Sequence, residues 1–135
     1  MSTTDKFDDL RPFIADEIPA AMQRIADSEA FDVLSRYVFP DRDVDEVRRM
    51  VRAIRTTDEF QLRVMYYVNL QIIRRSITRL TVDGLDALDP AERYLFISNH
   101  RDIMLDSALL QYLLHEAGHR TTEITFGSNL MQGEP

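Results

Sequence analysis

The chain has 135 residues, of which 44% are hydrophobic, enough to bury one core but hardly a second independent domain. It contains no cysteine, which excludes a disulfide framework, a thiolate metal site and a cysteine nucleophile. The formal net charge of -7 argues against a general nucleic-acid binder, because such proteins neutralise phosphates with a basic surface.

No stretch approaches the roughly 18 consecutive apolar residues of a membrane span. The N-terminal sequence MSTTDKFDD also lacks the basic-then-apolar order of a signal peptide. We therefore expect a cytoplasmic protein, with at most a peripheral contact at the inner membrane face. The acidic total charge makes strong electrostatic docking on a membrane a poor explanation, so such a contact would use apolar surface.

Residues 1–78 are predicted to form an N-terminal helical region. Asp16 precedes the sequence EIPAAMQRIAD, where Pro19 is tolerated only in the first turn of a helix. Ser28 is predicted as the N-cap of a short second helix that stops before Pro40. The apolar faces of these two helices are predicted to contain Ile18, Met22, Ile25, Phe31, Leu34 and Val38.

Two capping boxes predict the next helix starts. Asp43 is followed by Glu46, and Thr56 is followed by Glu59, at the spacing in which the first side chain caps the backbone of the second residue. The second box opens a long helix over about 58–78, whose sequence FQLRVMYYVNLQII is apolar nearly all round. We expect that helix to be central.

The helix after Asp43 has a basic face opposite its apolar one. A strip of this kind either binds phosphate or is a solvated helix face, and the second interpretation is the commoner one. The strip consists of Arg48, Arg49, Arg52 and Arg55.

Residues 79–135 are predicted to begin an α/β sheet. LTVDG (80–84), YLFIS (94–98) and TEITFG (122–127) are strand candidates, and a helix is expected over about 103–117, ended by Gly118. Strand, helix and strand at this spacing predict a right-handed parallel crossover. His100 would then lie at the carboxyl end of a strand, where open parallel sheets bind their ligands.

One alternative function is a zinc-dependent hydrolase. The run from His115 to His119 satisfies the pattern H-E-x-x-H, which needs both histidines on one face of a continuing helix, plus a third ligand. Gly118 is expected to stop the helix and move His119 off that face. Only Glu123 and Glu134 follow as carboxylate candidates, so we favour histidines at a helix C-terminus, where they meet the negative end of the dipole.

The segment SNHRDIMLD places a histidine beside two aspartates. Imidazole is suited to accept the proton of a hydroxyl that attacks a thioester, and a carboxylate on its other nitrogen would orient it and stabilise the cation. His100 is the candidate base, and either Asp102 or Asp106 is the candidate carboxylate. A structural hydrogen bond is the alternative for the same residues.

The stretch TVDGLDALDPAERYLFISNHRDIMLDSALL resembles the glycerolipid acyltransferases, which acylate glycerol 3-phosphate and lysophosphatidic acid. The resemblance covers about residues 80–110 and includes the family's first block, Asn-His with an aspartate downstream. It implies that His100 is the base and Asp106 the orienting partner, with Asn99, Arg101 and Asp102 shaping the turn or contacting substrate. It further implies an acyl-CoA or acyl carrier protein donor, a glycerol phosphate or lysophospholipid acceptor, and no metal or other cofactor.

The chain departs from that family in two ways. The usual spacing would put the aspartate at position 105, where Leu105 stands, and Asp106 comes one residue later. The later blocks, with a phosphate-binding arginine and a Glu-Gly-Thr-Arg-like sequence, do not occur before Pro135. We therefore expect a truncated sheet and little or no acyltransferase activity from this chain alone. A non-catalytic helical module that binds a partner through an apolar face is the remaining alternative.

Overall fold

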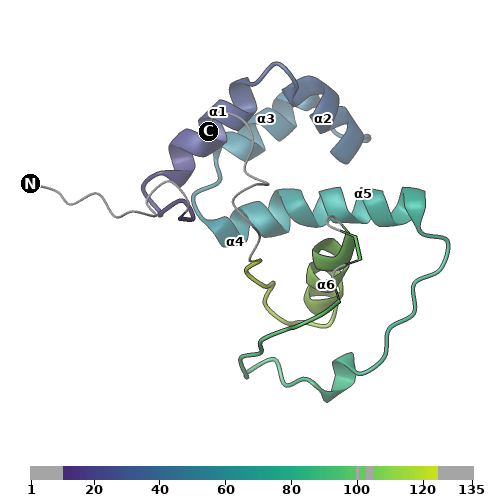
Figure 1. Ribbon diagram of the computed structural model, residues 1–135. Helices are drawn as coiled ribbons and strands as arrows, with labels where there is room; N and C mark the ends of the chain where they lie inside the picture. Colours follow the sequence, from purple (N-terminus) through teal and green to yellow (C-terminus); the bar gives the residue numbers. More distant parts are fainter. Residues whose placement is uncertain (1–10, 100, 103–104, 125–135) are drawn as a thin grey trace, which may run out of the picture.

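The computed structural model describes residues 11–99, 101–102 and 105–124. In this part of the chain the elements are α1 (Ile18–Asp27), α2 (Phe31–Val38), α3 (Val44–Arg52), α4 (Thr57–Phe60), the π-helix η1 (Gln61–Met65), α5 (Tyr66–Ser76), the 3-10 turn η2 (Leu85–Ala87) and α6 (Leu105–Glu116). Helices α1 to α3 pack on one another, and the run α4–η1–α5 lies between them and α6 (Figure 1). None of these helices combines the length and apolar character needed to cross a bilayer.

The core is built where the apolar faces of α1, α2 and α3 meet. Phe60, Val64 and Val68 cover it from the side of the long helical run. Apolar residues at helical spacing produce this arrangement, as predicted, although Ile25 and Leu34 face solvent instead. The buried members are Ile18, Ala21, Met22, Ala26, Phe31, Val38, Phe39, Val47, Val51 and Ile54.

Both predicted capping boxes start helices. The Asp43 carboxylate accepts the backbone N–H of Glu46 at 3.0 Å, and the Thr56 hydroxyl accepts that of Glu59 at 3.1 Å. The prediction for Ser28 is wrong, because this residue caps the C-terminus of α1, where its hydroxyl donates to the Ile25 carbonyl. Helix α2 starts after Ala30 with no side-chain cap.

The long helical run is central, as predicted, and two amides on it are buried. Asn69 donates to the Ala108 carbonyl on α6, and Gln71 donates to the Val38 carbonyl at the end of α2, both at 3.3 Å. These bonds satisfy the amide N–H groups inside the protein and join three parts of the chain. The sequence pattern did not predict that the run is interrupted by the π-helical segment η1.

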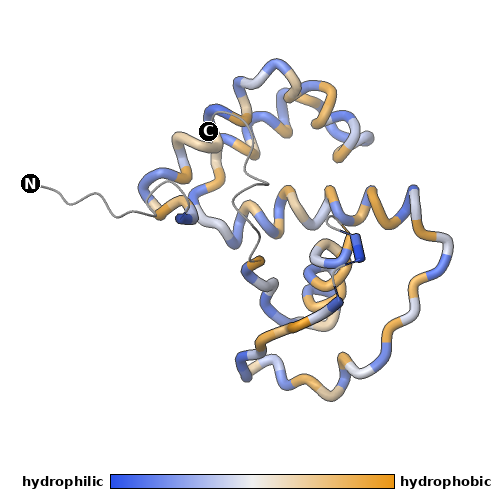
Figure 2. The backbone as a smooth tube through the Cα atoms, viewed as in Figure 1, coloured by the Kyte–Doolittle hydropathy of each residue, from blue (hydrophilic) through white to orange (hydrophobic). Residues whose placement is uncertain are grey.

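The predicted α/β fold is wrong, because the described residues are helical and contain no strand. Residues 80–84 and 94–98 are irregular, and the described part of the third candidate, 122–124, is irregular too. Leu95 and Ile97 are 86% and 87% exposed on the loop between α5 and α6, which curves outward from the end of α5 and then returns to α6 (Figure 2). A strand is stabilised by hydrogen bonds and side-chain pairs with a neighbour, and among the described residues these segments have none.

Candidate functional site

The turn that leads into α6 contains the residues expected to perform acyl-transfer chemistry. His100 lies outside the described residues, so its predicted position at a strand end is not observed. The strand that should precede it is absent from residues 94–98. Asn99, Arg101 and Asp102 are exposed, and Asp106 is half-buried.

Asp102 caps the start of α6. Its Oδ1 accepts the backbone N–H of Leu105 at 2.8 Å, and its carbonyl accepts that of Asp106 at 3.2 Å. Aspartate is among the residues preferred at this capping position, because its side-chain oxygen accepts an N–H that the helix leaves without a partner.

Asp106 reaches back from α6 to the turn. Its Oδ2 accepts the backbone N–H groups of Arg101, at 2.7 Å, and Asp102, at 3.0 Å. Both donors lie at a helix N-terminus, where N–H groups and the helix dipole stabilise negative charge. The turn therefore holds a carboxylate against the residue that directly follows His100 in the chain.

The candidate zinc pattern lies at the other end of α6. The helix stops at Glu116, and Gly118 adopts a φ of 81°. The backbone N–H of Gly118 bonds to the His115 carbonyl at 3.0 Å, and that of His119 bonds to the Leu114 carbonyl at 2.8 Å. These two bonds form a Schellman motif, which ends the helix between the two histidines as the glycine predicts.

Side chains of this pattern contact the first residue of α5. The His115 ring packs edge-on against Tyr66 at 5.0 Å between centroids, and the Tyr66 hydroxyl donates to Glu116 at 2.9 Å. Desolvation, together with the bond to Glu116, raises the pKa of Tyr66 to about 12. Among the described residues, no group of three or more His, Asp or Glu side chains is placed to hold a metal ion.

The basic strip on α3 is divided between two roles. Arg48 pairs with Asp32 and Arg52 pairs with Asp27, each at 2.5 Å, so these two side chains tie α3 to the ends of α1 and α2. Arg55 donates to the carbonyls of Arg52 and Ile54. Arg49 is exposed and has neither an ion pair nor a side-chain hydrogen bond among the described residues.

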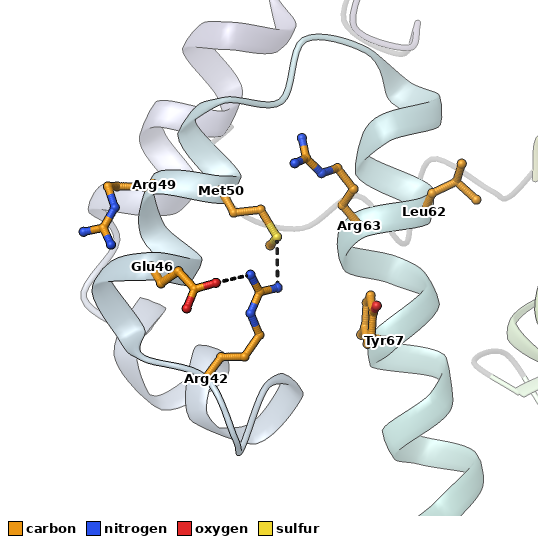
Figure 3. A pocket seen from close by; sticks show the side chains of 7 residues that line it. All are labelled: Arg42, Glu46, Arg49, Met50, Leu62, Arg63 and Tyr67. Carbon is orange, nitrogen blue, oxygen red and sulfur yellow. Dashed lines mark hydrogen bonds and ion pairs between the residues drawn. The ribbon is translucent and has the colours of Figure 1, made fainter.

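The sequence did not indicate a cavity of about 430 Å³ between α3 and the start of the η1–α5 helix. Figure 3 shows Arg42, Met50, Arg63 and Tyr67 around the gap, with Arg49 and Leu62 pointing away from it. Arg42 and Arg63 lie 21 positions apart in the numbering, and neither belongs to a sequence motif. Only the packing of α3 against the long helix brings these side chains together. The cavity is lined by Arg42, Glu46, Arg49, Met50, Leu62, Arg63 and Tyr67.

Comparison of the chain with protein-family models, curated proteins and solved structures found no match in any of the three. The function is therefore inferred from the residues of the turn and of the cavity.

Proposed function

We propose that the turn from Asn99 to Asp106 supplies the base and the orienting carboxylate for transfer of a fatty acyl group. The donor is the thioester of acyl-CoA or acyl carrier protein, and the acceptor is a hydroxyl of a glycerol phosphate or a lysophospholipid. The observation that supports this proposal is the hydrogen bond that the backbone N–H of Arg101, the neighbour of His100, donates to the Asp106 carboxylate.

The reaction needs one proton to move twice. His100 removes the proton of the acceptor hydroxyl while its oxygen attacks the thioester carbonyl, and an ester bond forms as the C–S bond breaks. The imidazolium then returns the proton to the departing thiolate, which leaves as a thiol. Asp106 orients the imidazole and stabilises its cation.

The contacts of the two aspartates favour Asp106 as the partner of the base. Asp102 caps α6 through its Oδ1 atom and Asp106 accepts two backbone N–H groups through its Oδ2 atom, so at least one oxygen of each carboxylate is engaged. Asp106 comes one residue later than the family spacing, yet its carboxylate folds back to the start of the turn. This geometry supports the assignment of orientation to Asp106 and of turn-shaping to Asp102.

Exposed apolar side chains precede the turn. Leu95 and Ile97 are the most exposed of the large hydrophobic side chains in the described residues. Apolar side chains of this kind beside a site favour contact with an acyl chain or a lipid surface. This supports a peripheral membrane contact close to the proposed site.

The test compares four variants in the product of the whole reading frame that encodes these residues. Thiol release from acyl-CoA is measured with glycerol 3-phosphate or lysophosphatidic acid as acceptor. We expect His100→Ala to lower kcat by about a hundredfold or more, the usual contribution of a general base. His119→Ala, at the histidine beyond α6, is the matched control and should leave the rate unchanged.

The aspartates are separated by a second pair of variants. Asp106→Asn should lower kcat and move the pKa of the base in the pH–rate profile downward, because the imidazolium loses a neighbouring negative charge. Asp102→Asn should leave both unchanged, since asparagine caps helices as well as aspartate does. A rate unaffected by His100→Ala would refute the proposal and favour a non-catalytic helical module.

A further inference from the structure

The cavity between α3 and the η1–α5 helix shares no residue with the turn of the proposed acyl-transfer site. Its volume of about 430 Å³ lies within the range of small-molecule pockets in proteins, about 300–1,000 Å³. We propose that this cavity binds a phosphate monoester, with Arg63 and Arg42 holding the phosphate and the Met50 and Tyr67 side chains contacting its organic part.

The charges around the cavity do not balance. Arg42 and Arg63 extend into it, and Arg49 lies at its edge and points away from it, whereas Glu46 is the single lining carboxylate and pairs with Arg42 at 2.5 Å. Among the described residues no carboxylate pairs with Arg63 or Arg49. A chain with 23 acidic and 16 basic residues has carboxylates in excess, so a gap with surplus guanidinium charge stands out. An anion in the gap would supply the negative charge that Arg63 lacks among the described residues.

The orientation of Arg63 depends on the π-helical segment. Arg63 lies in η1, and Figure 3 shows its side chain extending from this helix toward the gap opposite Arg42. A π turn places one extra residue in the helix and so rotates the residues around it by about 100° relative to a regular α-helix. Short π segments are rare and often occur at functional sites.

The other lining groups indicate what the anion carries. The Arg42 guanidinium lies 5.5 Å from the centroid of the Phe39 ring and contacts the Met50 sulfur at 3.5 Å, so it is held beside apolar surface. Tyr67 lines the cavity and packs against Phe39 with 5.2 Å between the ring centroids. Guanidinium groups suit the oxygens of a phosphate, and a ring and a thioether suit an attached apolar group.

The experiment measures binding of phenyl phosphate to the full chain by isothermal titration calorimetry, with inorganic phosphate as the probe without an organic part. Phenyl phosphate should bind more tightly than inorganic phosphate. Arg63→Gln should weaken phenyl phosphate binding by about tenfold or more, the effect of losing a charge-assisted hydrogen bond. Arg74→Gln removes the same charge from an exposed position on α5 outside the cavity and should change the affinity less than about twofold.

Glu46→Gln provides a variant with the opposite effect. It removes the carboxylate that competes for Arg42, so phenyl phosphate should bind about twofold or more tighter. Circular dichroism establishes that each exposed substitution leaves the fold intact. Equal weakening in Arg63→Gln and Arg74→Gln would overturn the proposal, because general charge attraction would then explain binding.

The phosphate could be soluble or attached to a lipid, and vesicles distinguish these sources. Co-sedimentation is measured with phosphatidylcholine vesicles that either contain or lack phosphatidic acid. Binding only to vesicles with phosphatidic acid, lost in Arg63→Gln and kept in Arg74→Gln, would support the cavity as a site for a lipid phosphate. Absence of binding to phenyl phosphate and to both vesicle types would overturn the proposal.

Discussion

At the turn before α6, two aspartates four positions apart have different tasks. Asp102 bonds forward to Leu105 and starts the helix, whereas Asp106 bonds backward to Arg101 and Asp102. The identity of the residues alone leaves the two interchangeable as partners of His100. The start of α6 decides which N–H groups each carboxylate accepts. Asp102 precedes the helix and caps it, whereas Asp106 lies in the first turn, next to the N–H groups at the helix N-terminus.

Glu17 is a further carboxylate that accepts several hydrogen bonds. Arg11 donates to it twice, at 2.6 and 2.7 Å, and the backbone N–H of Ile14 donates at 3.0 Å. The hydrogen bond from Arg11, followed by that from Ile14, lowers the pKa of Glu17 from 4.5 to about 2. A lowered pKa stabilises the folded state above the unfolded value, and this contribution is lost as the pH falls from 4.5 through about 2.

Glu17→Gln should therefore lower the urea midpoint of unfolding at neutral pH. The difference in midpoint between the variant and the wild type should become smaller as the pH falls toward 2. Equilibrium unfolding of both proteins across this pH range checks the prediction. Glu29→Gln, at an exposed position with no ion pair among the described residues, controls for removal of a carboxylate. A difference in midpoint that stays constant down to the lowest pH would contradict the lowered pKa of Glu17.

At the scale of the element, the end of α6 shows why a match to a short zinc-binding motif does not produce a zinc site. The H-E-x-x-H pattern requires one helix through both histidines, but the left-handed Gly118 ends the helix between them. The same glycine satisfies the last carbonyls of α6 through the bonds from Gly118 and His119. The local sequence predicts this end because glycine adopts a positive φ without a steric penalty.

Gly118→Ala should destabilise the protein by about 1 kcal/mol, because alanine is strained at a φ of 81°. A Cβ atom there would meet no heavy atom within 4 Å, so the loss would come from backbone conformation and not from a clash. Gly118→Asn should lose less, since asparagine tolerates the left-handed region better. Urea unfolding measures both, and an equal loss in the two variants would contradict this explanation.

The π segment η1 is an element that sequence reasoning missed. The pattern over 58–78 is apolar nearly all round, so it predicts a buried helix without indicating where an extra residue enters the turn. The segment is packed from two sides, by Val64 against the core of α1 to α3 and by Gln61 against Thr121 after α6. These contacts involve residues that are distant in the sequence, so a local pattern does not predict them.

At the scale of the whole molecule, the core of α1 to α3 contains ten of the eleven hydrophobic residues that are buried in the described part of the chain. Ile54 follows α3 and is 0% exposed, whereas Ile25 on α1 is 41% exposed. Ile54→Ala should lower the free energy of unfolding by about 2–5 kcal/mol, because it leaves a cavity in close-packed surroundings.

Ile25→Ala makes the same chemical change at the surface and should cost less than about 0.5 kcal/mol. Equilibrium unfolding in urea, followed by circular dichroism, compares the two variants. Similar losses would mean that the core of α1 to α3 is not packed as described.

The sequence by itself determined which segments are helical and how several of them begin and end. Asp43, Thr56, Asp102 and Gly118 act through bonds to residues within five positions, so their effects are visible in a local pattern. Tertiary structure decided that residues 94–98 form no strand, because a strand depends on a neighbour that the described residues do not provide. It also decided that Arg42 and Arg63 line one cavity, since the packing of α3 against the η1–α5 helix, and not a local pattern, brings residues 21 positions apart together.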